Sequence, residues 1–173
     1  MLDLCLILAP NPAVTNPKMY YPLGALYLTS VVEQAGYSVE IVDFRDGVKP
    51  IPEARYTGFS CTTPEINFAK ELKVKGKTIV GGAHPTLLPD DCKDFDYVIR
   101  GEGEEIILDL LANKLEEGIH TTRRIKFLDE LPLPAWNKID NPFSDTLFVG
   151  EKYGKGEKAA TLITSRGCPF NCS

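Results

Sequence analysis

The chain has 173 residues, 43% of them hydrophobic and 25% charged, and a mean hydropathy of -0.11. That balance is ordinary for a soluble globular domain with a core of its own. The net charge of -5 leaves no basic surface for phosphate backbones, so no nucleic-acid partner is expected. No apolar run approaches the ~20 residues of a membrane span. The five cysteines follow no disulfide spacing and favour a reducing cytoplasm.

Strand and helix patterns alternate along the first two thirds of the chain. Apolar runs predict strands at residues 2–9, 38–44, 56–62, 77–81 and 96–100. Apolar side chains at helical spacing follow the first, third and fifth strands, whereas the Gly- and Pro-rich residues 45–55 predict a turn or loop in place of a helix. Such alternation forms right-handed crossovers and a parallel sheet. The expected fold is α/β, a flavodoxin-like (Rossmann-like) doubly wound sheet of five strands in the order 2-1-3-4-5.

The pattern changes after Gly118. The following segment is rich in proline and short apolar patches, which predict an extended connector packed across the sheet domain, with Trp136 as an anchor. Two short strands, possible partners in a hairpin, are predicted at residues 146–149 and 161–165. The expected organisation is a sheet domain over 1–118, a connector over 119–145, and a further unit beginning in 146–173.

The loops that follow the predicted strands are rich in small and hydroxylated residues. Ligands of an open parallel sheet bind at the carboxyl ends of its strands, and small residues let a large ligand approach the backbone there. The candidate cofactor-binding residues are Asn11, Ser60, Thr62, Thr63, Gly81, Gly82, His84, Thr86, Gly101, Glu102 and Gly103. Glycine and threonine also end strands and cap helices without any ligand, so loop composition alone fits both interpretations.

Several motifs in these loops favour structural roles. His84, between glycines and Pro-Thr, is more typical of a loop organiser hydrogen-bonded to the backbone than of a metal ligand or base. Its acidic neighbours at residues 90–91 match no zinc spacing. The GEGE sequence at residues 101–104 lacks the third glycine of a dinucleotide fingerprint, and GEKYGK at 150–155 is one residue too short for a phosphate loop.

Two cysteines near the end of the sequence give the sharpest chemical signal. Cys168 and Cys172 stand four positions apart on a predicted loop that leaves the strand at 161–165. Thiolates on a loop can ligate an iron–sulfur cluster, although a disulfide or a chance pair would have the same spacing. The two residues are therefore candidate metal ligands, and the flanking sequence has to decide between these alternatives.

The flanking sequence resembles a known family. TSRGCPFNCS resembles the start of the radical SAM motif CxxxCxxC, with Cys168 and Cys172 in its first two positions and the third beyond Ser173. Upstream, four segments resemble the amino-terminal cobalamin (B12)-binding domain of B12-dependent radical SAM enzymes: YYPLGALYLTSVVEQAGYSVEIVD, IVGGAHPTLLPDD, DYVIRGEGE and LDELPLPAWNKID. That group includes methyltransferases and the anaerobic cyclase acting on magnesium-protoporphyrin monomethyl ester. The resemblance covers nearly the whole chain and implies a piece cut from a longer enzyme.

The resemblance also implies the cofactors. The sheet domain would hold the corrin above its strand ends, with the nucleotide tail among the loops after the third, fourth and fifth strands. The Asp-x-His-x-x-Gly motif that supplies a lower cobalt ligand in corrinoid mutases is absent, because Gly82 stands two residues before His84. Cobalamin is therefore expected to bind base-off, without a histidine ligand. In the full-length parent, a [4Fe-4S] cluster and S-adenosylmethionine would support methyl transfer or cyclisation at an unactivated carbon.

This piece alone is expected to be catalytically silent, since the third cluster cysteine and the barrel are missing. Its expected partners are its own missing radical SAM barrel, a small-molecule substrate, and a second copy paired through the orphaned strand at 161–165. The main alternative is a cofactor-free α/β scaffold or substrate-recognition domain of a radical SAM enzyme. A receiver-like regulatory domain is a distant third, because no acidic pair follows the first strand.

Overall fold

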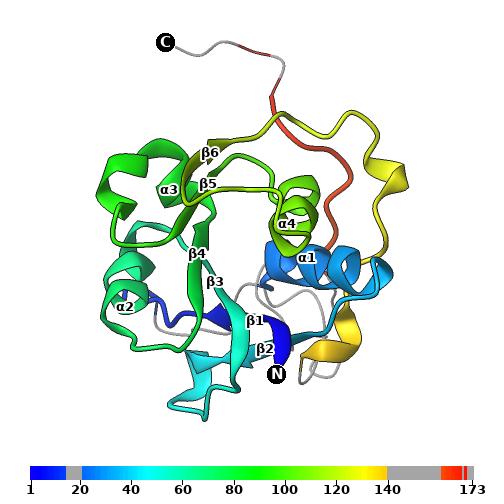
Figure 1. Ribbon diagram of the computed structural model, residues 1–173. Helices are drawn as coiled ribbons and strands as arrows, with labels where there is room; N and C mark the ends of the chain where they lie inside the picture. The colour runs from blue at the N-terminus through cyan, green and yellow to red at the C-terminus, as the bar shows by residue number, and fades with distance from the viewer. Residues whose placement is uncertain (15–20, 140–160, 169, 171–173) are drawn as a thin grey trace, which may run out of the picture.

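One parallel sheet organises the protein. The computed structural model describes residues 1–14, 21–139, 161–168 and 170 (Figure 1). Within them the strands follow the order β2-β1-β3-β4-β5-β6, and every neighbouring pair is parallel. The strands are β1 (Leu2–Leu8), β2 (Val39–Asp43), β3 (Ala54–Ser60), β4 (Lys77–Gly81), β5 (Tyr97–Arg100) and β6 (Gly118–Thr121).

Short helices connect these strands. The α-helices are α1 (Leu23–Gln34), α2 (Ile66–Glu71), α3 (Ala83–Leu87) and α4 (Glu104–Leu111). Single turns of 3-10 helix are η1 (Phe44–Asp46), η2 (Thr63–Glu65), η3 (Pro89–Cys92), η4 (Leu128–Glu130) and η5 (Trp136–Lys138). No helix in the described ranges is long and apolar enough to cross a membrane.

Local sequence signals explain where the first elements begin and end. The unbroken apolar run of β1 is buried from Leu4 to Leu8, because the strand is paired on both edges and covered on both faces. Pro22 precedes α1, and Gly36 with φ +85° follows it. Thr62 and Glu65 form a reciprocal capping box before α2, which satisfies backbone donors that the helix start would leave free.

The sheet has one strand more than predicted. The order 2-1-3-4-5 is confirmed, but β6 adds a sixth strand beside β5, in a stretch interpreted from sequence as a helix stop followed by a connector. The strand has only four residues and lies at the sheet edge. Because its residues alternate only between half-buried and exposed, its apolar pattern is weak. The helix before it, α4, ends at Leu111.

The later part of the chain follows the predictions in part. The connector packs across α1, where the Ser30 hydroxyl donates to the Leu133 carbonyl over 2.6 Å and the ring centroids of Trp136 and Tyr21 lie 5.5 Å apart. Residues 161–165, predicted as a strand, are not paired with any strand in the described part of the chain. The strand predicted at 146–149 lies outside the described residues. The dimer expected through 161–165 stays a prediction.

The core divides between the two faces of the sheet (Figure 1). We call the side covered by α1 and α4 the α1/α4 face; its buried side chains are Leu4, Leu6, Leu8, Ala25, Val32, Val39, Tyr56, Ile79, Tyr97, Ile99, Ile107, Leu110 and Leu111. We call the opposite side the α2 face; its buried side chains are Cys5, Ile7, Val42, Phe44, Ala54, Phe59, Cys61, Ile66, Ala69, Val80, Cys92, Phe95 and Val98.

Candidate functional site

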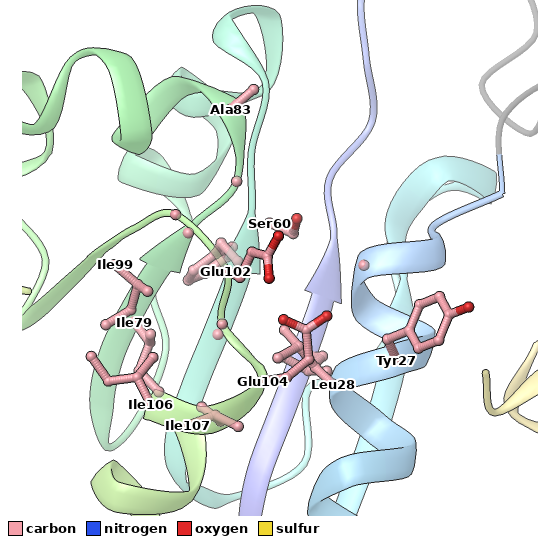
Figure 2. Close-up of a pocket in the computed structure, with 18 of the residues that line it drawn as sticks. Tyr27, Leu28, Ser60, Ile79, Ala83, Ile99, Glu102, Glu104, Ile106 and Ile107 are labelled. Atoms are coloured by element: carbon pink, nitrogen blue, oxygen red, sulfur yellow. The ribbon is translucent and has the colours of Figure 1, made fainter. Parts of the chain in front are cut away.

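A cavity of about 550 Å³ lies on the α1/α4 face, beside the carboxyl ends of β3, β4 and β5. Its floor is the sheet and its walls are α1, α4 and the extended segment 161–168. The residues that line it are Leu6, Gly24, Tyr27, Leu28, Gly58, Phe59, Ser60, Ile79, Gly81, Gly82, Ala83, Ile99, Gly101, Glu102, Gly103, Glu104, Ile106, Ile107, Leu110, Ile163 and Arg166. Figure 2 shows the isoleucine side chains gathered on the side of β4, β5 and α4, and Tyr27 on α1.

Glycines on facing elements keep this cavity open. Gly58 lies in the middle of β3, where an added Cβ would approach a Leu6 methyl to 2.9 Å. Gly24 on α1 and Gly81 at the end of β4 have ordinary room, since an added Cβ would lie 3.9 Å from the Ser60 hydroxyl and 3.8 Å from Ile99. A larger side chain at Gly24 or Gly81 would extend from the lining of the cavity, whereas one at Gly58 would first have to displace Leu6.

Two other glycines, at the rim of the cavity, are required by the backbone conformation at their positions. Gly82 has φ +102°, and an added Cβ would lie 2.8 Å from the backbone nitrogen and oxygen of Cys61. Gly101 has φ +99°, and an added Cβ would lie 2.5 Å from the Thr122 hydroxyl. Both glycines are needed by the close approach of neighbouring loops, whether or not a ligand binds.

The polar groups of the cavity are concentrated in the GEGE turn. Figure 2 shows the carboxylates of Glu102 and Glu104 directed into the space beside α1. Arg166 meets both: its Nη2 lies 2.7 Å from Glu104 Oε1 and its Nη1 lies 3.6 Å from Glu102 Oε2. Its guanidinium also lies 5.2 Å from the ring centroid of Tyr27. Burial lowers the pKa of Arg166, but the hydrogen bond and charge of Glu104 and the charge of Glu102 outweigh it, so the pKa lies above its ordinary value.

The residues singled out from the sequence divide into two groups. Those that line the cavity are Ser60, Gly81, Gly82, Gly101, Glu102 and Gly103. Those outside its lining are Asn11, Thr62, Thr63, His84 and Thr86. Asn11 donates to Glu65 over 3.3 Å, and the Thr62 hydroxyl donates to the same carboxylate over 2.8 Å. The Thr86 hydroxyl donates to the Gly82 carbonyl and accepts the Gly101 amide, which ties the loops after β4 and β5 together.

His84 is buried, with 3% of its surface exposed, and both ring nitrogens have partners. Its Nδ1 lies 3.2 Å from the Thr63 hydroxyl, and its Nε2 lies 2.9 Å from Asp91 Oδ2. Its backbone amide donates to the Cys61 carbonyl. The ring therefore braces its loop through two side chains rather than through the backbone contact expected from the sequence, and none of these three residues lines the cavity.

The structure describes one of the two candidate cluster cysteines. Cys168 is exposed, two residues beyond Arg166, whereas Cys172 lies outside the described residues. Within the described ranges no three His, Cys, Asp or Glu side chains are grouped so that they could hold a metal ion.

Sequence reasoning missed the walls of the cavity. Gly24, Tyr27 and Leu28 come from α1, and Arg166 directly follows the strand predicted at 161–165. Gly24 carried a usable signal, because glycine is unfavourable inside a helix unless close packing or open space requires it. Nothing local to Arg166 indicates that it would reach residues more than sixty positions earlier.

An open parallel α/β sheet with an apolar pocket at the carboxyl ends of its strands defines a class of cofactor- and nucleotide-binding domains. The family model described as the B12 binding domain matches residues 13–111, and the chain belongs to that family. The match includes β2 to β5 and all four α-helices, and so most of the cavity.

Similarity to individual curated proteins covers more of the chain than the family model does. It is 30% identical to an uncharacterized methyltransferase of Pyrococcus horikoshii, over 87% of this chain and 39% of that protein. It is 28% identical to the bacteriochlorophyllide d C-8(2)-methyltransferase of Chlorobaculum tepidum, over 92% of this chain and 36% of that protein. It is 26% identical to the anaerobic magnesium-protoporphyrin IX monomethyl ester cyclase of Synechocystis, over 95% of this chain and 40% of that protein. The chain therefore spans well under half the length of these relatives. No solved structure is significantly similar to it.

Proposed function

We propose that this chain is the cobalamin-binding module of a radical SAM enzyme, and that the cavity on the α1/α4 face takes the nucleotide tail of base-off cobalamin. The observation that carries the proposal is the cavity itself, about 550 Å³ beside the strand ends of a B12-binding domain. Small-molecule pockets have volumes of roughly 300–1,000 Å³ and mostly apolar walls.

The lining fits the chemistry of such a tail. The floor and one wall are aliphatic, from Ile79, Ile99 and Ile106, and suit a planar heteroaromatic base. The Ser60 hydroxyl and the rim glycines supply polar contacts and close backbone approach for the sugar and phosphate. Because Thr63 and Asp91 already engage both ring nitrogens of His84, the structure supports binding without a histidine ligand on the cobalt.

The parent enzyme would combine two cofactor chemistries. Cobalamin, when bound, supplies a methyl carrier, and two of the relatives described above are methyltransferases by name. Cys168 and Cys172, with a third cysteine, would hold the cluster that cleaves S-adenosylmethionine. We propose a small-molecule substrate, a cytoplasmic location, and methyl transfer or cyclisation as the reaction of the whole protein.

A second function has one specific observation in its favour. Arg166 already pairs with Glu102 and Glu104 at the cavity, so the chain itself satisfies the carboxylates there. A cofactor-free scaffold or substrate-recognition domain would need no other occupant.

Retention of hydroxocobalamin decides between the two functions. The chain is mixed with hydroxocobalamin and passed through a desalting column, and the visible spectrum of the protein fraction is recorded. We expect retained colour with the absorption shape of base-off cobalamin. Colourless protein at micromolar concentrations would favour the scaffold, and a base-on spectrum would contradict the proposed tail site.

A pocket-filling variant locates the binding site. Gly24→Phe places a ring in the cavity without backbone strain in α1, because an added Cβ there makes only an ordinary contact, 3.9 Å from the Ser60 hydroxyl. We expect retention to weaken about a hundredfold, since the ring and the tail would compete for one space. Gln34→Phe, on an exposed position of the same helix, is the matched control and should bind as the wild type does. Equal affinity in both variants would place the cofactor elsewhere.

A further inference from the structure

Arg166 joins the segment 161–168 to the sheet domain. Arg166 lies between the carboxylates of Glu102 and Glu104, and its guanidinium covers the ring of Tyr27 at 5.2 Å. Only 19% of its side chain is exposed. An arginine held by two carboxylates and an aromatic ring is fixed in both position and orientation, because its planar donors match the carboxylates and its face stacks on the ring.

Glu104 gives this arrangement its strength. It is 5% exposed and is the one buried carboxylate in the part of the chain that the structure describes. A buried carboxylate without a positive partner is costly, so removing Arg166 would leave an uncompensated charge beside the apolar cavity. The GEGE turn therefore needs a cation, and the segment that carries Cys168 supplies it.

Glu102 extends the same contact to the connector. Its Oε2 accepts the Ile125 amide at 2.7 Å as well as facing Arg166. Immediately after Arg166 the chain turns at Gly167, with φ +84°, where an added Cβ would lie 2.5 Å from an Arg124 side-chain nitrogen. The segment is thus packed against the connector on one side and α4 on the other, and Figure 1 shows it passing beside α1 and α4.

We propose that Arg166 is a positioning residue, which docks the segment 161–168 on the carboxylates of Glu102 and Glu104 and so fixes Cys168 beside the mouth of the cavity. Ile163 and Arg166 then form one wall of the cavity, so the loop of the candidate cluster cysteines and the pocket are built as one unit. The docking itself does not require a cofactor; its role beside a cluster rests on the proposed function.

Trypsin tests the docking without any cofactor. The protease needs the side chain of Arg166 in its own acidic pocket, so cleavage of the 166–167 bond requires the ion pairs to open first. In Glu104→Gln the charge is lost with little change of shape, and we expect cleavage at this bond to be about tenfold faster. Glu102→Gln should give a smaller increase, because the distance to Arg166 is longer. Glu105→Gln, an exposed change on the same turn of α4, is the matched control and should leave the rate unchanged.

Two further readouts separate docking from general stability. Cleavage after Arg100, at the end of β5, reports unfolding of the sheet and should stay constant in Glu102→Gln. A fluorophore on Cys168, in a Cys172→Ser background, should become more mobile in both docking variants and not in Glu105→Gln. Equal cleavage and equal mobility in wild type and both variants would overturn the proposal, even if hydroxocobalamin is retained. Increased cleavage and mobility would support it even if hydroxocobalamin is not.

Discussion

The two faces of the sheet are built for different purposes. On the α2 face aromatic rings fill the space: the ring centroids of Phe44 and Phe68 lie 5.4 Å apart and those of Phe59 and Phe95 lie 5.9 Å apart. The α1/α4 face also has an aromatic pair, Tyr56 and Tyr97, but Gly58 and Gly81 line a cavity there. Both faces supply packing energy, but the α1/α4 face gives up part of it where a cavity leaves room for an occupant.

The difference arises between consecutive residues of one strand. Gly58 and Phe59 stand next to each other in β3, and successive residues of a strand point to opposite faces. The glycine leaves the cavity open, while Phe59 is 3% exposed and belongs to the core of the α2 face. A shift of one position in strand register would exchange the filled and the hollow face.

The largest expected effect is a difference in thiol reactivity between the buried cysteines of the α2 face and the exposed Cys168. The buried cysteines Cys5, Cys61 and Cys92 all belong to the α2 face, and burial raises the pKa of Cys5 and of Cys61 to about 12. A thiol reacts as its thiolate, whose fraction at pH 8 is then only about one in ten thousand. We expect iodoacetamide at pH 8 to modify these two residues at least about a thousandfold more slowly than the exposed Cys168.

Peptide mass spectrometry over a time course measures these rates. In urea, where the burial is removed, the rates should converge. Modification of Cys61 in the folded protein as fast as that of Cys168 would show that the α2 face opens readily.

Truncation of one side chain on each face should separate their contributions to stability. Phe95→Ala removes a buried ring from the filled face, and we expect the free energy of unfolding to fall by about 3–5 kcal/mol. Ile106→Ala removes a half-buried side chain that already borders the cavity, and we expect a loss of only about 1 kcal/mol. Urea unfolding of both variants measures the two losses. Equal losses would contradict the distinction between a filled and a hollow face.

The smallest expected effect comes from an imperfection in the filled face. Thr57 is 1% exposed, and its hydroxyl has no hydrogen-bond partner among the described residues. Thr57→Val replaces that hydroxyl by a methyl group of similar size and should raise the free energy of unfolding by about 1 kcal/mol. Thr57→Ser keeps the hydroxyl and should lower it. A thermal unfolding midpoint that falls in Thr57→Val would mean that the hydroxyl is satisfied in solution.

The parts of the fold predicted from the sequence are those with strong local patterns. The unbroken apolar run of β1 and the proline and glycine around α1 fix those elements almost to the residue. The loops after β3, β4 and β5 were also identified as one site, because the carboxyl ends of parallel strands meet at a single edge. Six of the eleven candidate residues line the cavity for that reason, namely Ser60, Gly81, Gly82, Gly101, Glu102 and Gly103.

The features that were missed depend on contacts distant in sequence. The edge strand β6 is held mainly by its register with β5, as in the pair Val98 and Ile119, rather than by its own pattern. Residues 161–165 have a strand-like composition but pair with no strand among the residues that the structure describes, and the adjacent Arg166 holds the segment by charge instead. The hydroxyls of Thr62 and Thr86 hydrogen-bond within their own loops, and composition alone does not distinguish such a loop brace from a binding group.

The central place of β1 has a consequence for how the chain folds. Its Leu4 pairs with Tyr56 on one side and with Val39 on the other, so the middle of the sheet joins residues some fifty positions apart. The chain loses the entropy of closing such long loops before strand pairing adds any stability, and this makes parallel sheets slow to assemble. We therefore expect the high contact order to limit the folding rate. Strand β1 cannot complete its pairing until β3 is in place.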